Sequence, residues 1–124
     1  MVQPISSLFS LHGRRALVTG SSRGIGAAIA RALARAGADM VINYVGNRDC
    51  AIAVSDEIRA MGRRSAAIGA DVGSREDSEK LIDASTELLG GLDILVSNAA
   101  IRHPENWRSV SWEHIDQQCL IRWV

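Results

Sequence analysis

The stretch Thr19-Gly20-Ser21-Ser22-Arg23-Gly24-Ile25-Gly26 separates a short apolar run, residues 16–18, from an alanine-rich segment that continues to Ala36. Glycine lets a backbone turn sharply out of a strand, approach a pyrophosphate closely and present unpaired N–H groups at a helix start. Three glycines in an ordinary loop are the alternative, but the flanking strand and helix patterns argue against it. The stretch therefore predicts the phosphate-binding turn of a nucleotide-binding βαβ unit.

Composition and charge narrow the classes of protein and partner. The 124 residues are 47% hydrophobic and carry a formal net charge of +0, so nothing in the overall charge favours binding to nucleic acid or to an anionic membrane. No apolar run approaches the ~20 residues of a membrane span, and residues 1–11 lack the basic start of a signal peptide. A cytoplasmic location is expected. Cys50 and Cys119 match neither a metal-binding spacing nor a disulfide framework, and both are expected to be reduced.

The chain divides into a leader, residues 1–13, and one dinucleotide-binding half-domain, residues 14–124. The leader contains Pro4 and paired serines and is expected to be irregular. Beyond it, short apolar runs alternate with segments of helical periodicity. Strands are predicted at residues 14–19, 40–44, 65–69 and 92–96, and helices from the glycine turn to residue 36, at 48–61 and at 75–89. This alternation predicts an α/β fold, a truncated Rossmann-type doubly wound parallel sheet with strand order 3-2-1-4 and helices on both faces.

Periodicity also predicts which side chains the helices bury. The first helix places one apolar stripe toward the sheet, beside several small alanines: Ile25, Ile29, Leu33 and Ala36. The second is expected to begin at an Asn47 cap and the third at a Ser74 cap. The inward residues of the third helix are expected to be Leu81, Ile82, Leu88 and Leu89.

The end of the second predicted strand indicates which dinucleotide is bound. NAD enzymes of this architecture usually place an Asp or Glu about 20 residues beyond the glycine turn, where it binds the ribose 2′-hydroxyl. Asn43 and Tyr44 occupy that place and would not repel a 2′-phosphate. Arg23 can supply a planar cation for such a phosphate, and Arg48 is a weaker candidate. NADP(H) is therefore expected to be preferred over NAD(H), the alternative being that Arg23 is a solvated loop arginine.

The glycine spacing narrows the family. The general dinucleotide fingerprint is Gly-x-Gly-x-x-Gly, whereas this chain has Thr-Gly-x-x-x-Gly-x-Gly, which resembles the turn of the short-chain dehydrogenase/reductase family. The resemblance runs from about Arg14 to Leu120 but covers only the cofactor-binding half of the family's domain. Asn43-Tyr44 followed by Gly46-Asn47 is similar to the 3-oxoacyl carrier-protein reductases.

This resemblance implies further contacts with the dinucleotide. It places Asp71 and Val72 at the adenine, although Asp71 could instead cap the following helix, a place for which Ser74 is better situated. Ser97-Asn98-Ala99-Ala100 resembles the family's Asn-Asn-Ala-Gly segment, whose backbone passes under the nicotinamide ribose. The expected dinucleotide-binding residues are Gly20, Ser21, Ser22, Arg23, Gly24, Ile25, Gly26, Asn43, Tyr44, Asp71, Val72, Asn98, Ala99 and Ala100.

The same resemblance identifies no catalytic residues in this chain. The family uses a serine and a tyrosine whose pKa is lowered by a lysine four residues on. The only tyrosine here is Tyr44, which is followed four residues later by Arg48, and the only lysine is Lys80. Cys119 stands where the family has its active-site asparagine. His12, His103 and His114 lack orienting partners in the sequence and are expected at the surface or in packing.

Three functional interpretations remain open. The chain can be an NADP(H)-binding portion of a reductase that is inactive alone, half of a split reductase completed by a second chain, or a stand-alone dinucleotide-binding or sensing module. In the family's sheet a fifth strand covers the fourth, so Ile94, Leu95 and Val96 are expected to form an unpaired edge. Self-association or a complementing chain is therefore expected. No metal site is predicted.

Overall fold

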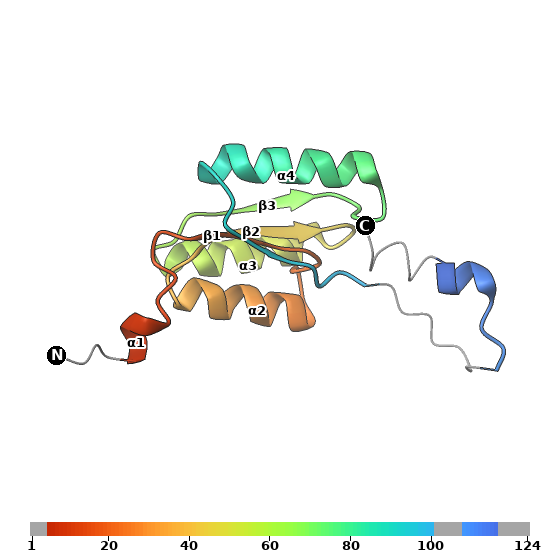
Figure 1. Cartoon of the computed structure of the whole chain (residues 1–124), viewed down its shortest axis with the longest axis horizontal. Helices are drawn as coiled ribbons and strands as arrows, with labels where there is room; N and C mark the ends of the chain where they lie inside the picture. The colour runs from red at the N-terminus through yellow and green to blue at the C-terminus, as the bar shows by residue number, and fades with distance from the viewer. Residues whose placement is uncertain (1–4, 101–107, 117–124) are drawn as a thin grey trace.

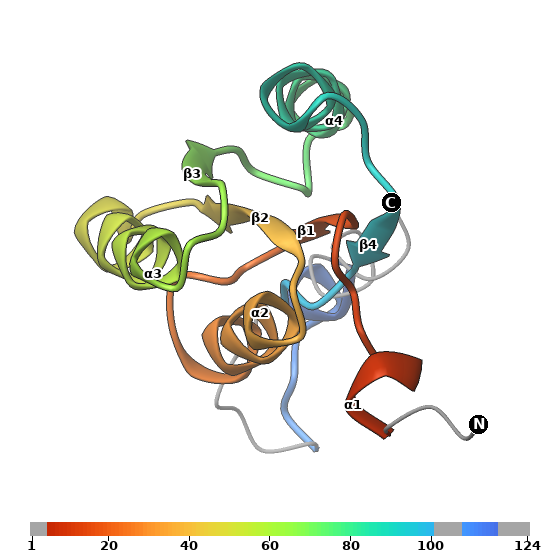
Figure 2. The ribbon, with the colours of Figure 1, turned by 90° about the vertical axis from the view of Figure 1, so that its left-hand side faces the viewer.

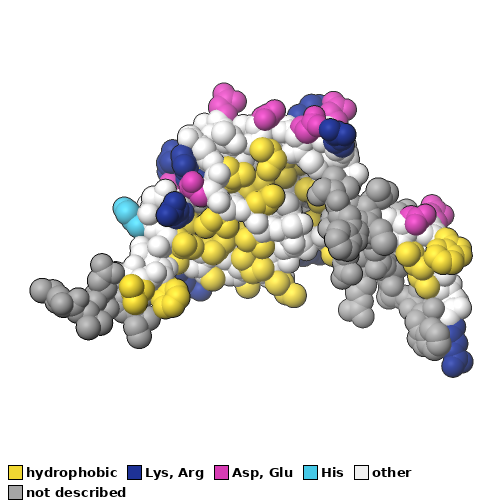
Figure 3. Space-filling model, in the orientation of Figure 1, with side chains coloured by type: hydrophobic (Ala, Val, Ile, Leu, Met, Phe, Trp, Pro, Cys, Tyr) yellow, Lys and Arg dark blue, Asp and Glu magenta, His cyan; other side chains and the backbone are white. Residues whose placement is uncertain are grey.

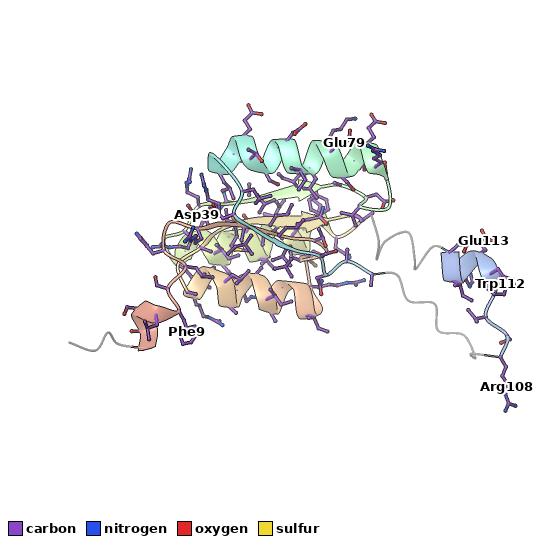
Figure 4. The ribbon with its side chains drawn as sticks, in the orientation of Figure 1. Phe9, Asp39, Glu79, Arg108, Trp112 and Glu113 are labelled. Atoms are coloured by element: carbon purple, nitrogen blue, oxygen red, sulfur yellow. The ribbon has the colours of Figure 1, made fainter. Side chains whose placement is uncertain are left out.

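Helices and strands alternate through most of the described chain. A computed structural model describes residues 5–100 and 108–116. Residues 112–116 are helical and Trp112 is exposed there (Figure 4). The elements are α1 (Ile5–Leu8), β1 (Arg15–Val18), α2 (Gly24–Arg35), β2 (Asp39–Tyr44), α3 (Arg48–Ala60), β3 (Ser65–Gly69), α4 (Arg75–Leu89) and β4 (Ile94–Val96).

The sheet confirms the predicted fold. Its four strands are parallel and follow the order β3-β2-β1-β4. Helices α2 and α3 cover one face and α4 covers the other (Figures 1 and 2). Because all strands run in the same direction, their carboxyl ends meet at one edge, where ligands of open α/β sheets bind. The glycine turn follows β1 at this edge.

The core lies on both faces of the sheet. Alternate residues of β1 point to opposite faces, so Ala16 and Val18 pack with α2 and α3, whereas Leu17 packs with α4. Helix α2 contacts the sheet through Gly26, Ala27, Ala30 and Ala34, all buried. These small residues allow the helix axis to lie close to the strands, which fixes the start of α2 above the strand ends.

The predicted buried faces of α2 and α4 were wrong in part. Ile25 is 75% exposed, and Ile29 and Leu33 are only partly buried, because α2 turns its alanines and not its larger residues to the sheet. In α4, Leu81 and Leu89 are buried as expected, but Ile82 is 37% and Leu88 52% exposed. Both lie off the narrow stripe by which α4 contacts the sheet.

Smaller differences concern the ends of elements. The leader contains the short helix α1 where irregular chain was expected. Asn47 precedes α3 but its side chain makes no capping hydrogen bond, whereas Ser74 Oγ accepts one from the Asp77 backbone N–H, as predicted. Met61 is the residue after α3 and not part of it. In the part of the chain that the structure describes, no helix combines the length and apolar character needed to cross a membrane.

Candidate dinucleotide-binding site

The glycine turn presents backbone donors at the start of α2. Gly20 and Gly24 have positive φ angles of 62° and 60°, which glycine adopts without strain. The first backbone bond of α2 runs from the Ala27 N–H to the Arg23 carbonyl, at 3.3 Å. The N–H groups of residues 24–26 therefore precede the helical hydrogen-bond ladder and lie at the positive end of the helix dipole. A Cβ added at Gly24 would meet no atom of the described residues within 4 Å, so among them the turn is open on that side.

Gly20 and Gly26 are required for a different reason, the close packing of two loops. A Cβ at Gly26 would overlap the Gly20 carbonyl and lie 2.6 Å from Nδ2 of Asn98. A Cβ at Gly20 would lie 3.0 Å from Cα of Ala99. Glycine at both positions lets the loop after β4 approach the turn after β1.

Thr19 joins these two loops, a role that sequence reasoning missed. Its Oγ1 accepts hydrogen bonds from the backbone N–H groups of Asn98, at 2.9 Å, and Ala99, at 3.0 Å. In return, Asn98 Nδ2 donates to the carbonyls of Thr19, at 3.1 Å, and Gly20, at 3.3 Å. The only signal in the sequence was that Thr19 directly precedes the first glycine of the turn.

The Asn43 side chain supports the glycine turn through hydrogen bonds. Its side chain is 1% exposed, and Oδ1 accepts a hydrogen bond from the Gly20 N–H at 3.0 Å. Its Nδ2 donates to the carbonyls of Ile68, at 3.2 Å, and Ala70, at 3.1 Å. The Asn43 backbone exchanges two further bonds with Ser21. Both ends of the Asn43 amide are thus bonded to the protein at the place where the ribose is expected.

The remaining residues of the turn differ in accessibility. Ser21 is fully buried and its hydroxyl donates to the Val18 carbonyl at 2.7 Å, while Ser22 is 8% exposed. The Arg23 side chain is exposed, and it has no hydrogen-bond or ion-pair partner within residues 5–100 and 108–116. Tyr44 is half-buried beside Gly69, where an added Cβ would lie 3.1 Å from the tyrosine ring. Arg23 is thus the accessible cation of the turn.

Asp71 and Val72 follow β3 at the same edge of the sheet. The Asp71 side chain is exposed, and its Oδ1 accepts a hydrogen bond from the Gly73 N–H at 2.9 Å. Val72 is half-buried against the α4 face of the core. Ala99 is half-buried and Ala100 exposed, whereas Cys119 lies outside the described residues. Among the described residues there is no cluster of His, Cys, Asp or Glu that could hold a metal ion.

Comparisons with known proteins give matches in sequence and in fold. Residues 14–121 match the family model described as short chain dehydrogenase. Versicolorin reductase stcU of Emericella nidulans is 49% identical over 96 residues, which are 77% of this chain and 36% of the relative. A short chain dehydrogenase from Burkholderia cenocepacia J2315, solved in complex with NADP, aligns with a TM-score of 0.86 and 44% identity over 91% of this chain and 46% of that one.

A second solved structure, a blue fluorescent protein from a metagenomic library in complex with NADPH, aligns with a TM-score of 0.85 and 37% identity. The alignment covers 92% of this chain and 47% of that protein. The chain therefore spans less than half the length of each of these three proteins.

Proposed function

Because this chain belongs to the short-chain dehydrogenase family, we propose that its glycine turn binds a nicotinamide dinucleotide. The observation that carries the proposal is the open turn at Gly24 at the start of α2, where the N–H groups that precede the helical hydrogen-bond ladder can donate to a pyrophosphate. Asp71 and Val72 would hold the adenine, and the backbone of residues 98–100 would lie under the nicotinamide ribose. A bound nicotinamide supplies hydride-transfer chemistry, and these residues bind and orient it.

The preferred dinucleotide in this proposal is NADP(H). Arg23 is exposed beside the start of α2 and, within the described residues, has no partner to compete with a phosphate. Neither Asn43 nor Tyr44 carries a charge that would repel the 2′-phosphate. The complexes of the two aligned structures with NADP and NADPH support the same class of ligand. Because the Asn43 amide is bonded to the protein, the preference rests mainly on Arg23.

The test is a fluorescence titration with NADPH and NADH on the wild-type chain and two variants. A charge-assisted contact contributes on the order of 1.5–3 kcal/mol, so NADPH should bind at least about tenfold more tightly than NADH. Arg23→Gln should remove most of that ratio and leave NADH binding nearly unchanged. Arg75→Gln, an exposed arginine at the start of α4, is the matched control. Equal affinities of the wild type for the two dinucleotides would reject the NADP(H) assignment.

Activity of a longer protein is a separate proposal. We infer that these 124 residues bind the dinucleotide without reducing a carbonyl compound, because Tyr44 and Lys80 cannot form the family's Tyr-x-x-x-Lys pair. Further polypeptide, covalently linked or added as a second chain, would supply the proton donor. A sensing module would use the same site without any turnover.

The edge of β4 is the place where further polypeptide would join. In the described part of the chain, β4 pairs with β1 alone, and Leu95 is 56% exposed. A hollow of about 130 Å³ beside this strand is lined in part by apolar side chains, those of Leu17, Val72, Leu81, Ile82 and Leu95. Figure 3 shows hydrophobic side chains on the face that carries β4. We propose that a second copy or a complementing chain covers this edge.

A further inference from the structure

We propose that a basic cavity at the amino ends of the strands binds a small phosphate-type oxyanion. The cavity has a volume of about 330 Å³, and its polar lining comes from Ser10, His12, Arg35 and Arg63. It lies at the carboxyl end of α2, whereas the glycine turn lies at the amino end of the same helix. The two sites are therefore separated by the length of α2, and this proposal goes beyond dinucleotide binding.

Three segments that are distant in sequence build the cavity. The leader contacts the end of α2 through a hydrogen bond from the Leu11 N–H to the Ala36 carbonyl, at 2.7 Å. The His12 backbone packs on Gly37, where an added Cβ would lie 2.9 Å from the His12 nitrogen. Arg63, in the loop after α3, donates to the Gly37 carbonyl at 3.2 Å and lies 3.3 Å from Nδ1 of His12. These contacts fix Arg63 and His12 side by side.

Carbonyl groups at the negative end of α2 are already bonded within the protein. Carbonyl groups at a helix end attract donors, which can account for an arginine at such a place. Here the carbonyl of Ala34 is bonded to the Gly37 N–H, that of Ala36 to Leu11, and that of Gly37 to Arg63. These three carbonyls are therefore bonded without the Arg35 guanidinium and without the remaining N–H groups of Arg63.

The charge around the cavity leaves a surplus of cations. In the described part of the chain, no acidic residue lines it. The acids at this end of the molecule pair with other arginines: Asp39, labelled in Figure 4, bonds to Arg64 at 3.1 Å. Glu57 bonds to Arg31 at 2.7 Å, and this hydrogen bond is the main cause of its lowered pKa, to which the charge of Arg35 adds a smaller part. Two arginines and a histidine thus line one cavity together with Ser10, whose Oγ accepts a hydrogen bond from the His12 N–H at 3.2 Å. Guanidinium groups bind phosphate oxygens in pairs.

Phosphate binding can be measured on the full chain by NMR. The ring signals of His12 and the side-chain N–H signals of Arg63 would be followed during titration with sodium phosphate, with ionic strength held constant by sodium chloride. Glycerol phosphate forms a second arm, because free phosphate and a phosphomonoester share the same recognising groups. We expect saturable chemical-shift changes at the cavity. The ligand that binds more tightly shows whether the cavity takes free phosphate or a phosphomonoester.

Two variants decide the proposal. Arg35→Gln should weaken phosphate binding several-fold, and Arg35→Gln with Arg63→Gln at least about tenfold, because each charged donor is lost. The Arg35 side chain makes no hydrogen bond with the described residues, so its variant stays informative even if loss of the Arg63 contact to Gly37 unfolds the chain. Arg75→Gln should bind like the wild type.

Non-saturable shifts, or equal phosphate affinity in wild type and Arg35→Gln, would overturn the proposal. NADPH titration of Arg35→Gln separates the two sites, because its dinucleotide affinity should not change. Failure of the cavity to bind phosphate would therefore leave the proposed dinucleotide site standing.

Discussion

At the level of single residues, the buried amide of Asn43 ties the glycine turn to the ends of β2 and β3. Asn43→Ala would leave the Gly20 N–H without its partner and remove one donor from each of two carbonyls. A buried donor left unpaired costs about 1–3 kcal/mol, so the urea midpoint of unfolding should fall and NADPH binding should weaken. Asn47→Ala is the control, because that side chain makes no capping bond. Similar midpoints for the two variants would contradict this role.

The position of Asn43 could be predicted from the sequence, but the direction of its side chain could not. Its distance from the glycine turn places it at the end of the second strand, which the structure confirms. In a strand buried on both faces, polar and apolar residues do not alternate, so the pattern does not show where an amide points. The glycines of the turn were easier to interpret, because glycine is required only where the backbone approaches another group closely or has a positive φ.

At the level of secondary-structure elements, Arg15 joins β1 to the residue before β4. Its Nε donates to Oδ2 of Asp93 at 2.9 Å and its Nη2 to Oδ1 at 3.1 Å. Hydrogen bonds from the Arg15 side chain, and then from its backbone N–H, hold the pKa of Asp93 below its ordinary value of 3.8. This carboxylate therefore stabilises the folded chain above its ordinary pKa, and the contribution is lost as the pH falls through the lowered value.

We expect Asp93→Asn to lose less stability on acidification than the wild type. Urea midpoints measured between about pH 3 and pH 7 should fall less steeply with acid in this variant than in the wild type. Asp56→Asn is the control, since Asp56 forms an exposed ion pair with Arg59 within α3. If Asp93→Asn and the wild type lose stability in parallel on acidification, Asp93 is not the titrating group.

Element order and strand order could be predicted, whereas the buried face of α2 could not. Alternating strand and helix patterns restrict a parallel sheet to few topologies, and the order 3-2-1-4 is confirmed. In α2, alanines and large apolar residues both recur at helical spacing, so periodicity alone did not show which stripe contacts the sheet. The structure turns Ala27, Ala30 and Ala34 inward because small residues permit the closer approach.

For the whole molecule, turnover is the first property to test. The purified chain should show no carbonyl reduction above background with NADPH, because it contains no Tyr-x-x-x-Lys. Loss of a proton donor alone lowers rates by about 10²–10⁴. The measurement is NADPH oxidation with a panel of ketones. A rate that Gly24→Val abolishes, and that survives removal of host reductases, would show that the chain is catalytic by itself.

The open edge of β4 predicts the association state of the whole molecule. Within the described residues the outer edge of β4 has no strand partner, and its N–H and C=O groups beside exposed Leu95 favour pairing with another chain. Light scattering should therefore give a mass above 13.3 kDa that rises with concentration. Leu95→Lys places a charge at this edge and should shift the chain toward monomer, whereas Val45→Lys, at an exposed site after β2, should not. A wild-type monomer at micromolar concentration, with a core protected from hydrogen exchange, would show that the four-stranded sheet is self-sufficient. That outcome would favour a stand-alone dinucleotide-binding module over half of a split enzyme.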